Sequence, residues 1–441
     1  YIERVHALAS PPGIHPLIKV GLAEVSCGMF RSVFRAIALL AATALLIGFV
    51  LDLPRLAPPD PVVIETGPVG GSYHRNALRY EQHLKAAGFK VEVRPNPQSL
   101  DSIGYVNGNG PKTHIAFTAQ AIDGSAFPNV RSAGVIQTQP LFTFLHKDLV
   151  GRVNTLADLK GLRLVMPPDR SATSEAARAV LGLFGVNPGN TTFTHLPIAE
   201  AAVELKAGRH DAGLFMLTAD NPLVVALGAN SALWMPSLTA APAVAGKLPW
   251  LRAVKLPVGT FDIGRNLPAQ EVEAVGAIVN VIVREDLHPA VLFELLRVMD
   301  EFHGGATLVN RAGEFPSLTS TELQPHPLAA QYRKTGVPWL YRHFSPFIAR
   351  MFESYLLIGL ALVLLVEGYK IWYYLREFWE EASERFALWT LKRLDRRFDR
   401  GARPGPIWRT LLRFAERVVQ RHETDHAKEL LSRVRSRLDS T

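Results

Sequence analysis

The sequence predicts an α/β fold in two lobes, flanked by an apolar helix on either side. Three observations lead to this prediction. Strand-like and helix-like segments alternate through residues 56–345, which is typical of open, mainly parallel sheets. That block of about 290 residues is long enough for two lobes. Apolar runs long enough to cross a bilayer stand before and after it.

The charge of the chain is unevenly distributed. The 441 residues carry a net charge of +8, and residues 376–441 hold 16 Lys/Arg against 11 Asp/Glu, which is +5 of that total. The basic character therefore belongs to a tail, and it does not predict nucleic-acid binding.

The only cysteine is Cys27. A single cysteine excludes an intramolecular disulfide and a metal site built from cysteines. Cys27 could be a lipid-attachment site or a small apolar residue. We favour the second interpretation because the apolar run follows the cysteine, whereas in a lipoprotein signal it would precede it.

The first apolar run covers Ala36 to Leu51 without a charge, and we expect a transmembrane helix over 33–52. Arg31 and Arg35 lie at its N-terminal edge. Asp52 and the prolines after it are expected to end the helix. No small-residue cleavage site follows, which favours a retained anchor over a removed signal peptide.

The second run, Tyr355 to Val366, extends to a transmembrane helix over 347–375. Trp372 to Tyr374 form an aromatic belt at its end. A buried core helix is the alternative. The positive-inside rule then places residues 1–32 and 376–441 in the cytoplasm and 56–345 outside it, in a two-pass protein of the cell inner membrane.

The middle block opens with a βαβ pattern. A buried strand at 62–66 leads through a glycine turn into a helix that Ser72 is expected to cap, and a second strand follows at 89–94. Further strands are expected at 114–118, 141–145, 163–166 and 212–217, and further helices are expected to begin at Ser171, Ala199 and Pro289.

Two turns have the character of a ligand site. In open α/β sheets, ligands bind outside the carboxyl ends of strands, where helices begin and present unpaired N–H groups that suit carboxylates. The turns contain Gly70, Gly71, Ser72 and Tyr73, and Ser171, Ala172 and Thr173. The alternative is that the hydroxyls only cap helices. Phe142 and Phe215 would add apolar contacts, or would belong to the core.

The ordered set of turns resembles the TAXI family, TRAP-associated extracytoplasmic immunogenic proteins, which are the solute-binding subunits of one class of TRAP transporter. The resemblance covers about Val62 to Phe347. It rests on short motifs that occur in family order, at Gly70–Tyr73, Ser99–Ser102, Gln139–Phe142, Asp158–Gly161, Ser171–Thr173 and Gly208–Ala212.

The resemblance implies a type II periplasmic-binding-protein fold with a hinge between two lobes, here about 60–142 plus 256–345 and 143–255. It implies a small carboxylate or amino-acid-like ligand, no cofactor, and TRAP-type permease subunits as membrane partners. It also adds Ser99 and Gln139 to the expected ligand contacts. Gln98, Asp101, Gln139 and Ala172 depart from the family residues, which leaves the identity of the ligand open.

We therefore expect a membrane-tethered protein that captures a small organic anion by hinge closure. An enzyme is not expected, because the sequence has no Gly-x-Ser-x-Gly elbow, no His-Glu-x-x-His helix and no Walker loop. Its histidines show no metal-ligand spacing. The alternative is a ligand sensor or scaffold that signals through its tail. The amphipathic stretches 386–398 and 407–419 could lie on anionic lipid, pair with a partner helix, or remain solvated.

Overall fold

The computed structural model describes residues 36, 39–319, 323–401, 405–421 and 425–439. Two compact units are present. We call Pro54–Met351 the central unit, and the residues before Pro54 and after Met351 the flanking unit. The N-terminal segment 1–32, with Cys27, lies outside the described residues.

The strands of the central unit form one curled sheet. Their order is β2-β1-β3-β10-β4-β7-β5-β6, with β8 paired to β4 and β9 paired to β10. The bounds are β1 Val62–Thr66, β2 Val91–Pro95, β3 Ile115–Thr118, β4 Val130–His146, β5 Arg163–Met166, β6 Thr192–His195, β7 Ala212–Met216, β8 Leu233–Trp234, β9 Leu251–Leu256 and β10 Val272–Arg284.

Strand β4 joins two halves of this sheet. Its residues Val130–Pro140 pair with β10, and its residues Leu141–Leu145 pair with β7. The first half contains β1, β2 and β3, and the second contains β5, β6, β7 and β8. The sequence predicted only the 141–145 part of β4 as a strand, and it did not predict β10. The expected lobe boundaries stay a prediction.

The α/β fold class is confirmed, but the expectation of mainly parallel sheets is wrong. Pairs β1–β2, β1–β3, β5–β6 and β5–β7 are parallel, whereas every pair that involves β4 or β10 is antiparallel. The sheet is mixed because two long strands run between the parallel parts, and antiparallel strands need no helical crossover.

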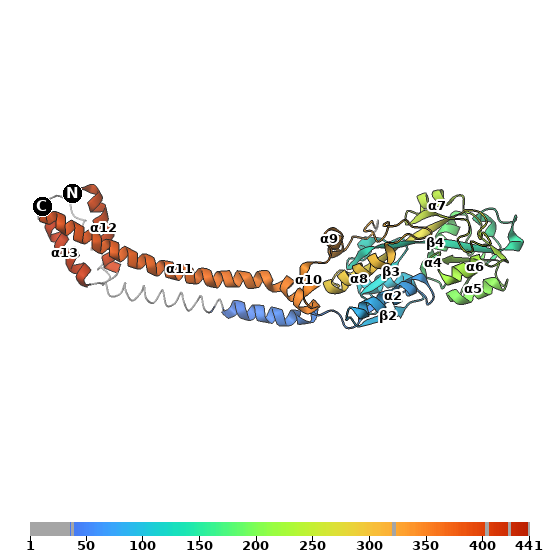
Figure 1. The fold of residues 1–441 in the computed structure, drawn as a ribbon, viewed down its shortest axis with the longest axis horizontal. Coiled ribbons are helices and arrows are strands. Elements are labelled where there is room, and N and C mark those ends of the chain that lie inside the picture. Colours follow the sequence, from blue (N-terminus) through green and yellow to red (C-terminus); the bar gives the residue numbers. More distant parts are fainter. Residues whose placement is uncertain (1–35, 37–38, 320–322, 402–404, 422–424, 440–441) are drawn as a thin grey trace, which may run out of the picture. The chain divides into compact units, whose positions relative to one another are not determined.

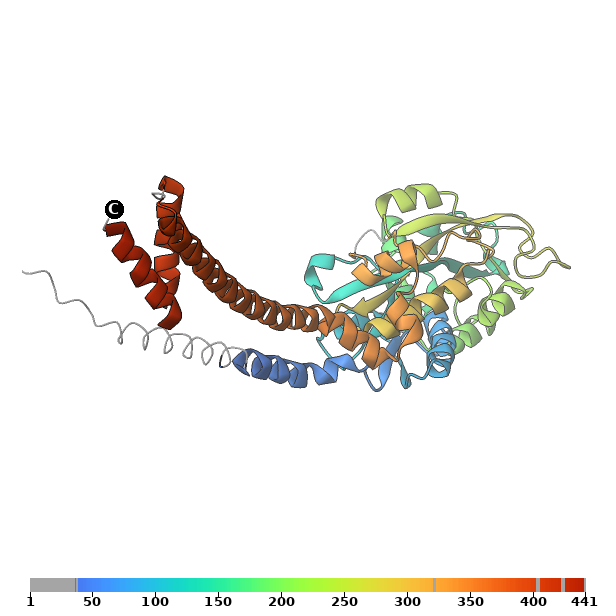
Figure 2. The same ribbon diagram turned by 60° about the vertical axis from the view of Figure 1, so that its left-hand side comes forward.

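Helices lie on either side of the strands in both views (Figures 1 and 2). Helix α2 packs beside α8 in the first half, and α4 packs on β7 in the second. The helices are α2 Ser72–Ala86, α3 Ser102–Asn107, α4 Ala172–Leu183, α5 Ile198–Lys206, α6 Pro222–Gly228, α7 Ala241–Lys247, α8 Pro289–His303, α9 Pro327–Thr335 and α10 Trp339–His343. Short 3-10 helices include η1 Ser99–Asp101, η2 Gly124–Ala126, η3 Lys147–Leu149 and η4 Leu156–Leu159.

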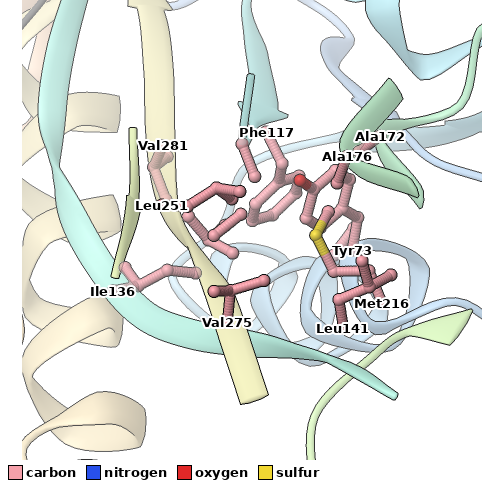
Figure 3. Close-up of a cluster of buried hydrophobic side chains, with 14 of the residues drawn as sticks. Tyr73, Phe117, Ile136, Leu141, Ala172, Ala176, Met216, Leu251, Val275 and Val281 are labelled. Carbon is pink, nitrogen blue, oxygen red and sulfur yellow. The ribbon is translucent and has the colours of Figure 1, made fainter. Parts of the chain in front are cut away.

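The largest apolar core runs through both halves. Figure 3 shows Tyr73 and Phe117 of the first half beside Ala172, Ala176 and Met216 of the second. Burial of these side chains from water stabilises the junction of the halves at roughly 25 cal/mol per Å² of apolar surface. A separate core in the second half contains Phe142 and Phe215.

The flanking unit contains two helices that are long and apolar enough to cross a membrane, Leu39–Leu56 and α11, Pro346–Asp399. Only 6% of the apolar window of each is buried. The first helix does not end at Asp52 as expected; it continues through Pro54 to Leu56 and stops before Pro58 and Pro59. A proline disfavours the helical conformation of the residue before it, which explains an end at this point.

The tail is a packed helical bundle. Helix α11 continues through the amphipathic stretch 386–398, and α12 Pro406–Arg421 and α13 Asp425–Asp439 follow. Their apolar faces meet in a core that includes Leu391, Leu412, Ala415, Leu430 and Val434. The amphipathic stretches thus pair with each other within the chain, and the alternative of a fully solvated tail is wrong.

Candidate ligand-binding crevice

A small crevice lies between the two halves of the sheet, at the carboxyl ends of β1 and β5. The turn Gly67–Tyr73 leads from β1 into α2, and the turn Pro167–Thr173 leads from β5 into α4. The crevice has a volume of about 30 Å³, enough for roughly one or two water molecules. Its lining consists of Gly67, Pro68, Gly71, Ser72, Tyr73, Ser99, Gln139, Pro167, Ser171, Ala172, Thr173, Ile198, Met216 and Leu217.

The glycines of the first turn are required by its geometry. Gly70 has a φ of +82°, which L side chains rarely adopt. A Cβ on Gly71 would meet the carbonyl oxygen of Pro68 at 2.9 Å. The tight geometry of the turn therefore favours glycine at both positions.

Direct hydrogen bonds hold the two halves together around the crevice. The Ser99 hydroxyl accepts from the Ala172 N–H at 3.1 Å, and the Ser72 hydroxyl accepts from the Thr218 N–H at 3.0 Å. The Asn221 side chain donates to the carbonyl oxygen of Gly70 at 3.3 Å. These bonds link the two halves directly across the crevice.

Two ion pairs join the halves on either side of the crevice. Nη2 of Arg75, in α2, lies 3.2 Å from Oδ2 of Asp220, which follows β7. Arg170, in the turn before α4, pairs with Asp101 of η1. Both pairs are partly exposed, so each contributes only modestly to closure, on the order of 0–1 kcal/mol.

The hydroxyl groups of the two turns have three different roles, and only Ser171 is a helix cap as expected. Ser171 is the N-cap of α4, where its oxygen accepts from the Ser174 N–H at 3.3 Å. Ser72 is not a cap: Gly71 occupies that position in α2, and the Ser72 oxygen bonds Thr218 instead. The Thr173 hydroxyl accepts from the Met216 N–H at 3.3 Å.

Two polar atoms in the crevice wall have no partner among the described residues. They are the Tyr73 hydroxyl and the side-chain nitrogen of Gln139, and both are buried. The Tyr73 ring stacks on Phe117 with centroids 5.6 Å apart, and burial raises the pKa of the tyrosine, so its hydroxyl stays protonated. A buried donor without an acceptor costs roughly 1–3 kcal/mol, so an oxygen that reached either group would relieve that cost.

The structure brings together most of the residues expected from the sequence. One crevice is lined by eight of them: Gly71, Ser72, Tyr73, Ser99, Gln139, Ser171, Ala172 and Thr173. Gly70 lies in the first turn of this crevice. Phe142 and Phe215 do not line it: both are fully buried in the core of the second half, where Phe142 lies near Phe261. The analysis of the sequence missed Met216 and Leu217, although they end the apolar strand predicted at 212–217.

Comparison with known proteins gives structural neighbours only. No family model and no curated protein matches the chain. One similar structure is the amino acid ABC transporter substrate-binding protein AbpA from Streptococcus pneumoniae bound to L-arginine (14% identity, 55% of this chain and 88% of that chain, TM-score 0.34). Another is the aliphatic sulphonate binding protein SsuA from Escherichia coli (14% identity, 68% of this chain and 94% of that chain, TM-score 0.33).

A third similar structure is CbnR complexed with its target DNA (13% identity, 63% of this chain and 80% of that chain, TM-score 0.36). The substrate-binding protein of an amino acid transporter and a periplasmic sulphonate-binding protein are thus among the structures similar to this chain. Membership of the TAXI family stays a prediction. At these identities the likeness says nothing about which ligand binds here.

Metal chemistry finds no support in the part of the chain that the structure describes. No group of three or more His, Cys, Asp or Glu side chains there could hold a metal ion.

Proposed function

We propose that the central unit captures a small organic anion or amino acid in the crevice between its two halves. One observation carries the proposal: two turns from opposite halves, each at the start of a helix, face one cavity, and two residues of its lining, Tyr73 and Gln139, have a buried polar group without a partner among the described residues. Helix starts and unpartnered donors both favour a carboxylate.

Capture requires the crevice to open. Its volume of about 30 Å³ is far below the roughly 300 Å³ at which ligand pockets of small molecules begin. The bonds between Ser99 and Ala172 and between Ser72 and Thr218 must therefore separate before a ligand enters. The hinge would lie in β4 near Pro140, where strand pairing passes from β10 to β7.

A ligand that contacts both halves stabilises the closed arrangement by its differential affinity for that arrangement. In the closed state, Tyr73, Gln139 and the start of α4 would surround its carboxylate. Met216 and Ile198 would provide apolar contacts.

We further propose that the helices Leu39–Leu56 and α11 anchor the central unit outside the cytoplasm, where it serves a TRAP-type permease. Support comes from the apolar length of both helices and from the ordered motifs that resemble TAXI proteins. The positive charge of the tail supports a cytoplasmic location for it.

A second candidate function is ligand sensing through the tail. The observation that favours it is the packed core of α11, α12 and α13, since an anchor alone needs no folded domain after the membrane. Deletion of residues 405–441 distinguishes the two candidates. Loss of a cellular response with uptake intact supports the sensor, and unchanged behaviour in both supports the transport subunit.

The binding proposal is tested by thermal unfolding of the full chain in detergent, with a panel of amino acids and small organic acids. At least one acid should raise the unfolding temperature. Tyr73→Phe removes an unpartnered hydroxyl, so the variant should be as stable as the wild type but bind at least fivefold more weakly. Tyr332→Phe, which loses a hydroxyl bonded to Asp300 outside the crevice, is the matched control. Equal binding by wild type and Tyr73→Phe would contradict the proposed site.

A further inference from the structure

A second and much larger cavity lies in the central unit. It has a volume of about 540 Å³ and is formed where α2, the middle of β4, the turn after β7 and the segment after α8 meet. We call it the hinge chamber. None of its lining residues lines the crevice. Its polar lining includes Arg75, Asn76, Arg79, Gln137, Asp220 and His303.

The hinge chamber contains buried donors without partners. The side-chain nitrogens of Asn76 and Gln137 form no hydrogen bond with any described residue, although these residues are only 6% and 7% exposed. The Thr138 hydroxyl, next to Gln137, is also buried without a partner. Native proteins pair almost all such groups with protein or ordered water, so these donors are candidates to bond an acceptor that enters from solvent.

The charge of the hinge chamber is positive. Arg79 lies 3.9 Å above the Phe302 ring, and no carboxylate of the described residues pairs with it. Arg75 pairs with Asp220, which is the only carboxylate in the lining. Two guanidinium groups therefore face one carboxylate, and one positive charge is left for an anion.

His303 adds no charge at neutral pH. Burial, and then the nearby Arg79, lower the pKa of this histidine to about 4. Its ring nitrogen Nε2 lies 2.8 Å from the Tyr80 hydroxyl, which fixes the ring in the wall. The positive character of the hinge chamber therefore comes from the arginines.

Part of the wall is apolar. This apolar part includes Ile136, Ala219, Phe302, Leu308 and Val309. The segment that supplies Leu308 and Val309 is held in place: the Thr307 N–H donates to the Asn310 carbonyl oxygen at 2.9 Å, and Arg252 donates to the Asn310 side chain at 2.7 Å. A fixed apolar wall opposite charged donors suits a ligand with an acidic end and an apolar end.

We propose that the hinge chamber is a second ligand site, which binds a small carboxylic acid with an apolar chain. The carboxylate bonds Arg79, Asn76 and Gln137, and the chain packs against Phe302, Leu308 and Val309. The hinge chamber has walls from both halves of the sheet, because Thr218 and Asp220 come from the second half. Occupancy of the hinge chamber therefore adjusts how firmly the halves close.

The test uses isothermal titration of the full chain in detergent, with empty micelles as the blank. Hexanoate and acetate are the probes, because they share the carboxylate and differ in the apolar chain. Hexanoate should bind saturably, and at least tenfold more tightly than acetate. Inorganic phosphate is the third probe and should not bind saturably.

Two variants and two controls localise the binding. Gln137→Met removes an unpartnered amide at nearly constant volume, and it should weaken hexanoate binding at least fivefold without lowering the unfolding temperature. Arg79→Glu should abolish the binding. Arg152→Glu makes the same charge change at an exposed position outside the lining, and Tyr73→Phe alters only the crevice. Arg152→Glu should bind hexanoate as the wild type does, and Tyr73→Phe shows whether hexanoate binds in the crevice instead.

Three results would overturn the second site. Absence of saturable hexanoate binding excludes it. Equal binding by wild type and Arg79→Glu also excludes it. If Tyr73→Phe weakens hexanoate binding as much as Gln137→Met does, the crevice and the hinge chamber are one site. Failure here leaves the crevice proposal standing, because that proposal is judged by the loss of binding in Tyr73→Phe and not by Arg79 or Gln137.

Discussion

The Ser99 hydroxyl accepts a hydrogen bond of 3.1 Å from the backbone N–H of Ala172, the first residue of α4. This bond joins the two halves of the sheet at the helix start that should receive a carboxylate. Ser99 thus occupies a donor that the ligand would use, and it also keeps the crevice shut. Opening the crevice exposes that donor.

Ser99→Ala should loosen the closed arrangement. The variant loses one hydrogen bond and leaves the Ala172 N–H without an acceptor, which should cost about 1 kcal/mol of the free energy of unfolding. Hydrogen exchange should become faster at the start of α4. Ser125→Ala, in an exposed turn, is the control. Unchanged exchange at Ala172 would show that Ser99 does not hold the halves together.

Stability should fall as the pH decreases from 6.5 to 4. Burial lowers the pKa of His114 to about 4, while its unfolded pKa stays near 6.5, so in this window the unfolded chain binds a proton that the folded chain does not. At pH 5 this difference amounts to about 2 kcal/mol of the free energy of unfolding. The Val63 N–H donates to Nδ1 of the neutral ring at 2.9 Å, which protonation would prevent.

His114→Asn keeps an acceptor for Val63 but cannot titrate in this range. The variant should therefore lose part of the decrease in stability between pH 7 and pH 5, because burial also lowers the pKa of His303, to about 4, and the pKa of His326, and both contribute to that decrease. Urea unfolding at several pH values measures this decrease in the free energy of unfolding, and His83→Asn is the control. A pH profile of His114→Asn identical to that of the wild type would contradict the assignment.

The tail bundle should unfold separately from the central unit. Leu391 is fully buried in the core of α11, α12 and α13, so Leu391→Asp should expose the bundle to limited proteolysis. Lys392→Asp changes the adjacent exposed residue and should leave the bundle resistant. Ligand stabilisation of the central unit should persist in both variants. Equal protease resistance of the two variants would contradict a packed tail.

The proposed topology can be tested by thiol labelling in intact cells. In a Cys27→Ser background, a cysteine at the exposed Val258 should react with an impermeant reagent added from outside the inner membrane. A cysteine at the exposed Trp389 should react only after the membrane is permeabilised. Labelling of both positions from the same side would contradict a two-pass arrangement with a cytoplasmic tail.

The local elements of the first half could be predicted well from the sequence. The buried strand at 62–66 and the helix from Ser72 follow from apolar periodicity and from a glycine turn, which are local signals. Strand β10 and the first part of β4 were missed, because both are buried on two faces and give no alternation of polar and apolar residues.

The crevice could be predicted from its turns, whereas the hinge chamber could not. Gly71, Tyr73 and Ser171 belong to turns that follow strands, and a general rule places ligands there. Arg79 and Gln137 lie inside a helix and a strand, and only the folded chain brings them near Phe302. Phe142 and Phe215 were wrongly expected at the site for a similar reason, because an aromatic residue in a strand fits a core as well as a site.

Opening and closing of the crevice is the central claim, and an inter-spin distance measures it most directly. Spin labels at Lys112→Cys in the first half and Lys206→Cys in the second, in a Cys27→Ser chain, report the separation of the halves. With an acid that raises the unfolding temperature, the distance distribution should shift and become narrower, because the ligand holds the halves at one separation, and Tyr73→Phe should require at least fivefold more ligand. A ligand that binds the crevice while the distribution stays unchanged would contradict hinge closure.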